Sequence, residues 1–277
     1  MRRSALLVGA VLLSVTACKS ASSDSAAPAP KPSQGKPSSA PVDAGAVVRA
    51  AVAATGATTA TVDTKHEMSA AGTQAVIATD GTLDMKADQG KLRVKLTATS
   101  SAQQPPVRAD EVFHGGKVYF RMPQSADGDT AWRAVPQADT QVHYLLRTPM
   151  NDPEHLLRQA ALAQKVTEVG KEKANGVPTV HYRGTLGRDA LTLRAGGDFR
   201  TKLDQLFVLT KNAPFTADVW VDARGRVTRT KFASTLPGMG STVTMNLTNL
   251  GKPLTPPVVP KGATEVPASM VKGALTG

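Results

Sequence analysis

The sequence is poor in residues that carry covalent and metal chemistry. Cys18 is its single cysteine among 277 residues, and aromatic side chains make up 4% of the chain. One cysteine can neither close a disulfide within the chain nor build a cysteine-based metal site. The sequence also lacks a Gly-x-Ser-x-Gly elbow, a His-Glu-x-x-His pair and a phosphate-binding Gly-x-x-x-x-Gly-Lys loop. We therefore expect no enzymatic activity, no catalytic residue and no cofactor.

Histidines at metal-ligand spacing are missing as well. The five histidines are isolated from one another along the chain: His66, His114, His143, His155 and His181. Asp127-Gly128-Asp129 begins like a calcium-binding loop, but no glutamate follows at the distance that such a loop needs. An isolated histidine is more often packed or solvated than bound to a metal. The sequence predicts no metal site.

The N-terminal apolar run is too short to cross a membrane. It extends from Ala5 to Leu13 behind Arg2 and Arg3, and small residues follow it. A positive start, roughly 7–15 apolar residues and small residues before the cut define a secretory signal peptide. Val15-Thr16-Ala17-Cys18 resembles the lipobox of bacterial lipoproteins, in which the cysteine is diacylated and becomes the new N-terminus. We expect residues 1–17 to be removed and palmitate-type acyl chains to be attached to the cysteine; the alternative is an ordinary signal peptide with an incidental cysteine.

The segment after Cys18 cannot build a core. Residues 19–41 are mainly Ser, Ala, Pro, Gly and Lys, without one large apolar side chain. We expect residues 18–41 to form a lipidated, disordered tether and residues 42–277 to form a single domain. A flexible coil of this length spans roughly 25–30 Å. The tether would then let the domain lie some distance from the extracytoplasmic face of the cell membrane, in which its lipid anchor is inserted.

The chain is basic, with 33 Lys and Arg against 22 Asp and Glu, and removal of Arg2 and Arg3 leaves a net charge of 31 − 22 = +9. A positive protein is attracted to anionic lipid headgroups and wall polymers. The basic residues are spread along the chain rather than clustered, so we expect no nucleic-acid partner.

After the tether, the spacing of apolar residues is first typical of a helix and then typical of β-strands. Asp43 is placed to cap a helix that ends near Thr55, and the face of that helix is predicted to comprise Val47, Ala50, Ala51 and Ala54. Further helices are predicted at Asn151-Asp152-Pro153 and near Asp198. A period of two predicts strands over residues 58–69, 73–86, 92–97, 107–114, 117–122, 132–135, 165–174, 177–184, 215–221, 227–235 and 243–247.

Short turn signals separate several of these strands. Asp88-Gln89-Gly90 and Asn175-Gly176 predict two hairpin turns. The strands show no βαβ rhythm, so the fold class is α+β. We expect a large curved antiparallel β-sheet, a half-barrel, with helices packed on its concave face.

Several short motifs occur in an order typical of one lipoprotein family. After the lipobox, tether and first helix come Lys117-Val118-Tyr119-Phe120-Arg121 with Trp132, then Asn151-Asp152-Pro153, Val180-His181-Tyr182-Arg183-Gly184, and the run from Ala217 to Val227. This order resembles the actinobacterial LppX/LprAFG lipoproteins, which have the fold of the carrier LolA. The resemblance implies a half-barrel around helices with an apolar cavity, and in some members the binding of acylated lipids or glycolipids for transport in the cell envelope.

The predicted inward-facing apolar residues have two interpretations. They pack as an ordinary core, or they line a cavity for acyl chains, which small and flexible side chains would leave room for. The cavity candidates are Leu83, Met85, Val94, Leu96, Val118, Phe120, Met122, Leu156, Leu203, Phe207, Val219, Val221 and Met245.

These observations support two functional hypotheses. The first is a membrane-anchored lipoprotein that binds the acyl chains of a lipid or glycolipid, for transport or presentation in the cell envelope. The second is a non-enzymatic interaction or sensor lipoprotein that uses its sheet as a platform for another envelope protein. A connected apolar cavity would favour the first hypothesis, and a filled interior would favour the second.

Overall fold

The computed structural model describes residues 42–70, 72–99, 106–122, 130–139, 152–193, 200–201, 204–205, 208, 215–236 and 238–267. They belong to one compact unit that begins at Val42. The predicted signal peptide, Cys18 and the tether lie outside the described residues. The helix predicted near Asp198 is described only at five positions, all of them helical: Arg200, Thr201, Asp204, Gln205 and Val208.

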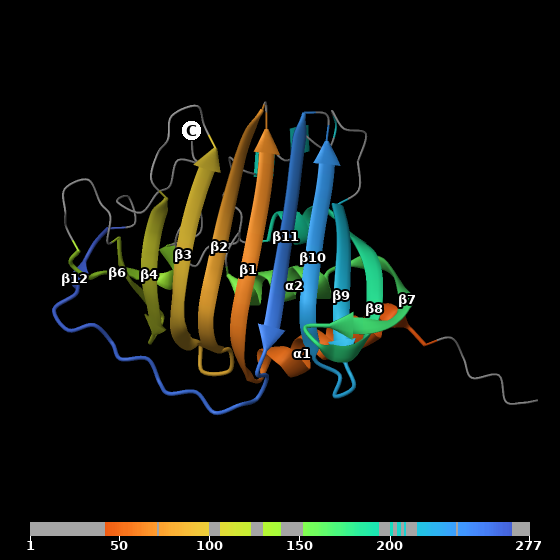
Figure 1. The fold of residues 1–277 in the computed structure, drawn as a ribbon, viewed down its shortest axis with the longest axis horizontal. Coiled ribbons are helices and arrows are strands. Elements are labelled where there is room, and N and C mark those ends of the chain that lie inside the picture. The colour runs from red at the N-terminus through yellow and green to blue at the C-terminus, as the bar shows by residue number, and fades with distance from the viewer. Residues whose placement is uncertain are drawn as a thin grey trace, which may run out of the picture. The chain divides into compact units, whose positions relative to one another are not determined.

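One large sheet of 12 strands forms the body of the unit, with few helices beside it (Figure 1). The strands are β1 (Thr59–Ala70), β2 (Thr73–Asp84), β3 (Gln89–Thr99), β4 (Val107–His114), β5 (Lys117–Arg121), β6 (Arg133–Pro136), β7 (Gln164–Ala174), β8 (Val177–Leu186), β9 (Phe215–Asp222), β10 (Val227–Leu236), β11 (Met239–Thr248) and β12 (Thr264–Glu265). Their order across the sheet is β12-β6-β5-β4-β3-β2-β1-β11-β10-β9-β8-β7.

The sheet consists of two meanders that meet in its middle. Strands β1 to β6 follow one another outward in one direction, and β11 back to β7 do so in the other. The junction is the antiparallel pair of β1 and β11, which runs from Thr61 opposite Thr248 to Ala70 opposite Met239. The prediction of an antiparallel sheet is correct for all pairs except β12 and β6, which are parallel.

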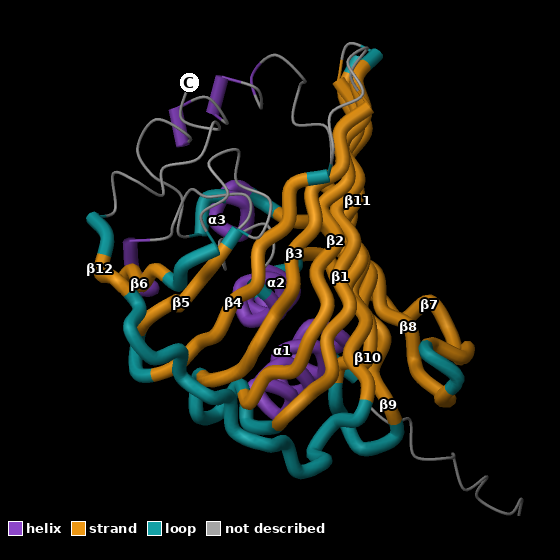
Figure 2. Tube along the Cα trace, turned by 60° about the vertical axis from the view of Figure 1, so that its left-hand side comes forward, coloured by secondary structure: helices purple, strands orange, loops and turns teal. Residues whose placement is uncertain are grey.

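Two helices pack on the same side of this sheet (Figure 2). Helix α1 (Ala44–Gly56) contacts β7, β9 and β10, and α2 (Pro153–Ala161) contacts α1 and β10. Both begin as the sequence predicts, because the Asp43 carboxylate accepts from the Ala46 N–H and the Asp152 carboxylate accepts from the Glu154 N–H. Two shorter elements are the 3₁₀ turn η1 (Gln137–Asp139) and α3 (Arg188–Leu191).

The predicted face of α1 is wrong in part. Ala51 is buried, but Ala50 and Ala54 are exposed, and the buried stripe is completed by Val48 and Thr55. The cause is a hydrogen bond to a side chain of the helix, which connects the helix to the sheet. The fully buried Thr55 hydroxyl donates to the Ala51 carbonyl at 2.7 Å and accepts from the Val227 N–H at 2.8 Å, at the start of β10. An alanine-rich sequence gives no hydrophobic contrast that would select this face.

Both hairpin turns that the sequence predicts are present, one of them at a shifted position. Asn175 and Gly176 both have positive φ, at 53° and 79°, as the predicted hairpin requires. The first predicted turn falls earlier than expected, at residues 85–88 with Asp88 at φ 46°, so that Gln89 and Gly90 belong to β3. Glycine is required at position 90 by the close approach of β2, not by its φ angle, because a Cβ there would lie 2.4 Å from the Thr82 carbonyl oxygen.

Candidate functional site

Most of the predicted cavity residues come together in one hydrophobic cluster between the sheet and the helices. We call it the apolar cluster. It includes the buried side chains Leu83, Met85, Val118, Phe120, Leu156, Val219, Val221 and Met245, together with Val48 and Ala51 of α1. The prediction that these residues share one interior space agrees with their positions, while their lining of a cavity stays a prediction.

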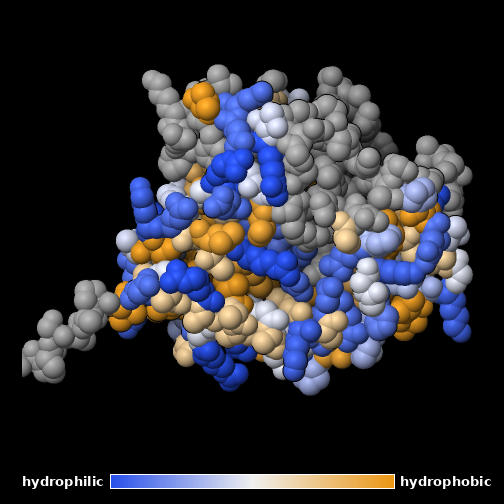
Figure 3. Space-filling model, turned by 180° about the vertical axis from the view of Figure 1, so that it is seen from behind, coloured by the Kyte–Doolittle hydropathy of each residue, from blue (hydrophilic) through white to orange (hydrophobic). Residues whose placement is uncertain are grey.

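The remaining predicted residues lie elsewhere. Val94 belongs to a second, smaller cluster with Ile77 and Ala109, and Leu96 packs against it. We call this the small cluster. Met122 packs against both this cluster and the apolar cluster. The side chains of Leu203 and Phe207 lie outside the described residues. The molecule seen from behind the sheet shows hydrophobic patches between hydrophilic residues (Figure 3).

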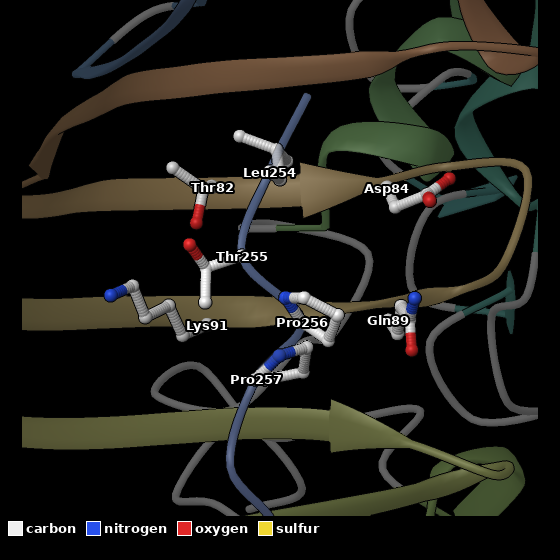
Figure 4. Close-up of a pocket in the computed structure, with 9 residues that line it drawn as sticks. Thr82, Asp84, Gln89, Lys91, Leu254, Thr255, Pro256 and Pro257 are labelled. Carbon is white, nitrogen blue, oxygen red and sulfur yellow. The ribbon is translucent and has the colours of Figure 1, made fainter. Parts of the chain in front are cut away.

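A shallow pocket lies on the opposite face of the sheet, where the segment Leu254 to Pro257 crosses the ends of β2 and β3 (Figure 4). Its volume of about 20 Å³ accommodates one water molecule and no acyl chain. Its lining includes the polar side chains Asp84, Gln89 and Lys91. We assign it no ligand.

Buried polar side chains cross the inner face of the sheet, the face that carries the apolar cluster. Thr230 of β10 pairs with Met245 of β11, Met245 with Thr64 of β1, Thr64 with Thr79 of β2, and Thr79 with Val94 of β3. Directly paired residues of adjacent strands point to the same face, so the three threonines lie in one row. We call Thr64, Thr79 and Thr230 the hydroxyl row.

None of the three hydroxyls has a hydrogen-bond partner among the described residues. The three side chains are no more than 2% exposed. A buried hydroxyl without a partner costs roughly 1–3 kcal/mol, so native proteins rarely leave several of them side by side. A row of three is therefore a feature that needs a physical explanation.

His66 lies next to the hydroxyl row, two residues after Thr64 on the same face of β1. Its Nε2 is 2.9 Å from the Ser241 hydroxyl, while its buried Nδ1 has no hydrogen-bond partner among the described residues. Burial lowers the pKa of His66 to about 4, because an imidazolium in this position would lose its hydration. The ring is neutral at pH 7 and offers one further hydrogen bond.

The lowered pKa of His66 predicts a loss of stability in acid. Below pH 6.5 the unfolded state takes up a proton that the folded state takes up only near pH 4. The folded state is therefore penalised by about 1.4 kcal/mol per pH unit, up to roughly 3 kcal/mol at pH 4. We expect His66→Gln to lose less stability than the wild type in urea unfolding between pH 7 and pH 4.5, with the exposed His114→Gln as control. Parallel curves for wild type and His66→Gln would contradict the assignment.

The outer face of the sheet carries a second polar group, built around Asp218 of β9. Its Oδ1 accepts from Arg183 Nε at 2.7 Å and lies 2.7 Å from His181 Nε2. His181 Nδ1 is 3.0 Å from Glu172, and the imidazole stacks on Trp220 with 4.4 Å between ring centroids. The indole N–H donates to the same Glu172 carboxylate. These groups satisfy one another, which is typical of a structural network.

Two classes of site find no support in the described ranges. No group of three or more His, Cys, Asp or Glu side chains there could hold a metal ion. No helix in the same ranges is both long and apolar enough to cross a membrane.

Sequence reasoning missed both polar groups. A signal for the hydroxyl row is present, because Thr64 and His66 have the same strand parity as the buried Val62, and Thr79 that of Ile77. Polar residues at inward positions of a strand interrupt the hydrophobic alternation. Like an exposed apolar patch, they are informative about structure or function. The network of Asp218 depends on pairing between strands, which spacing within one strand does not reveal.

Comparison with known proteins gives matches among solved structures. No protein-family model matches the chain, and no curated protein sequence matches it either. LprF from Mycobacterium bovis matches with 14% identity and a TM-score of 0.48, over 78% of this chain and 96% of that protein. LppX from Mycobacterium tuberculosis matches with 15% identity and a TM-score of 0.45, over 76% and 97%. The complex of MucA and MucB from Pseudomonas aeruginosa matches with 12% identity and a TM-score of 0.33, over 80% and 59%. The first two are lipoproteins of the group that the motif order of this chain resembles.

Proposed function

We propose that this protein is a lipoprotein that is anchored through Cys18 to the extracytoplasmic face of the cell membrane and binds the acyl chains of a lipid or glycolipid. It acts by binding alone and carries out no covalent chemistry. The bound chains lie on the concave face of the sheet, between the strands and helices α1 and α2. The protein transports the lipid or presents it within the cell envelope.

The observation that carries this proposal is the apolar cluster. It brings inward-facing residues of β2, β5, β9 and β11 together with residues of α1 and α2, and many of the candidates chosen from the sequence are among them. Many of its members are small, including Ala51, Ala60, Ala160 and Ala217. Methionines such as Met85 and Met245 adapt their shape to a neighbour at little cost. Such a lining suits a flexible hydrocarbon chain.

Burial of hydrocarbon supplies the binding energy. Each CH₂ group removed from water contributes about 0.8 kcal/mol. A chain of about ten buried CH₂ groups therefore gives ample affinity even after the cost of ordering the chain. The net charge of +9 expected for the mature chain favours an anionic or polar headgroup at the protein surface.

A substitution that fills this space tests the site. We expect Ala217→Phe, on the inner face of β9, to weaken uptake of a fluorescent fatty-acyl probe roughly tenfold, since displacement of two CH₂ groups costs about 1.6 kcal/mol. Ala78→Phe, on the exposed outer face of β2, is the matched control and should bind like the wild type. Circular dichroism confirms that both variants fold. Wild-type uptake by a folded Ala217→Phe protein would place the acyl chains elsewhere.

The second hypothesis, a protein-binding platform, makes a different prediction. Cross-linking in cells would then capture one envelope protein in stoichiometric amount, and the purified protein would carry no lipid. The outer face of the sheet would be the contact surface, and it bears ion pairs such as Arg93 with Asp80 and Arg121 with Asp110.

A further inference from the structure

We propose that the hydroxyl row and His66 bind the ester carbonyl groups of a lipid with two or more acyl esters. This inference rests on the proposed function and names the chemical class of its ligand. It begins from four buried atoms without partners among the described residues: Thr64 Oγ1, His66 Nδ1, Thr79 Oγ1 and Thr230 Oγ1. They lie on β10, β1 and β2, and β11, which carries Met245, separates β10 from β1.

The surroundings of the row define what fits there. At one end of the row, Val219 of the apolar cluster pairs with Thr230, and at the other end Val94 and Ala109 of the small cluster follow Thr79. Met245 of the apolar cluster lies within the row, between Thr230 and Thr64. A molecule that lies along this line therefore meets hydrocarbon, then one hydroxyl, then the Met245 side chain, then two hydroxyls, and then hydrocarbon again. Lipid esters have this order, because each carbonyl has an acyl chain on one side and the lipid backbone on the other.

The spacing favours several esters over one. Adjacent strands are about 4.8 Å apart, so the row extends roughly 14 Å from Thr230 to Thr79 across three strand spacings. A single carbonyl can reach two neighbouring hydroxyls at most. A diacyl or triacyl lipid brings two or three carbonyls and can satisfy more of the row.

The chemistry of the groups agrees with a carbonyl acceptor. A threonine hydroxyl rotates to donate, and a carbonyl oxygen accepts two hydrogen bonds. The neutral ring of His66 donates from Nδ1 whenever its Nε2 accepts from Ser241. A bound ester would thus remove the cost of the unpartnered atoms, and that relief would appear as affinity for the ester lipid.

A matched pair of ligands tests the inference. The mature chain, purified and stripped of lipid, is mixed with equal amounts of a diacylglycerol and its dialkyl ether analogue, which lacks both carbonyls. Native mass spectrometry reports the ratio of the two complexes. We expect the wild type to prefer the ester lipid roughly tenfold, as two neutral hydrogen bonds would give. We expect the triple variant Thr64→Val, Thr79→Val, Thr230→Val to bind both lipids equally.

Stability provides an independent readout. Valine has the shape of threonine without the hydroxyl, so removal of an unpartnered group should leave the ligand-free triple variant at least as stable as the wild type. Thr244→Val, on the outer face of β11, is the control and should keep the ester preference. A clear loss of stability in the triple variant would show that the hydroxyls already have protein or water partners, and would overturn the inference.

The outcomes separate the two proposals. If the wild type binds ester and ether lipid equally, the hydroxyl row does not hydrogen-bond to the carbonyls, while the proposal of lipid binding is retained. If it binds neither, the proposed function fails. A preference that survives in the triple variant would place the ester groups elsewhere in the protein.

Discussion

Cys18→Ser is expected to release the protein from the membrane completely. Serine lacks the thiol that receives the diacylglyceryl group, and one acyl anchor or none gives only weak, reversible membrane binding. Because Cys18 is the sole cysteine, no other residue can replace it. We expect the wild type in the membrane fraction, heavier by a lipid moiety than its peptide chain, and the variant in the soluble extracytoplasmic fraction.

Ser22→Ala, in the same tether, is the matched control and should stay in the membrane fraction with its lipid. Equal fractionation of wild type and Cys18→Ser would refute the anchor. A wild-type protein that is soluble and unlipidated would instead identify an ordinary signal peptide with an incidental cysteine.

Asp218→Ala is expected to destabilise the fold by roughly 1–3 kcal/mol, the cost of leaving the donors that face this buried carboxylate without their acceptor. The Asp218 side chain is 8% exposed, and it faces Arg183 and His181 at 2.7 Å each. Its removal leaves Arg183 and His181 of β8 without their shared partner. Because strands β8 and β9 carry part of the apolar cluster, the loss would also loosen the inner face.

Urea unfolding measures this effect, and an exposed pair is the control. Asp80 and Arg93 form an ion pair with side chains 51% and 74% exposed, so we expect Asp80→Ala to cost at most about 1 kcal/mol. A cost below about 1 kcal/mol for Asp218→Ala would mean that the network contributes no more than a surface pair does.

The sequence predicted the elements of this fold well because their signals are local. Strand alternation identified β4 at its observed bounds, and side chains at Asp43 and Asp152 identified both helix starts. Asn175-Gly176 identified its hairpin because few other dipeptides accept two positive φ angles. Each of these features depends on residues close together in the chain.

The parts that escaped prediction depend on residues far apart. The pairing of β1 with β11 joins Thr61 to Thr248, and no short pattern indicates such a partner. The buried face of α1 is selected by a bond from the Val227 N–H to Thr55, again across the sheet. For the candidate site, parity within strands placed apolar side chains such as Val219 and Met245 together, but it could not show that three threonines line up across β10, β1 and β2.

Native mass spectrometry of the untagged protein from its own host tests lipid binding most directly. We predict a population heavier than the acylated chain by the mass of one non-covalent lipid, which dissociates on collisional activation and yields fatty acids on hydrolysis. Repeated spectra of lipid-free protein, together with no uptake of a fatty-acyl probe, would contradict the proposed function.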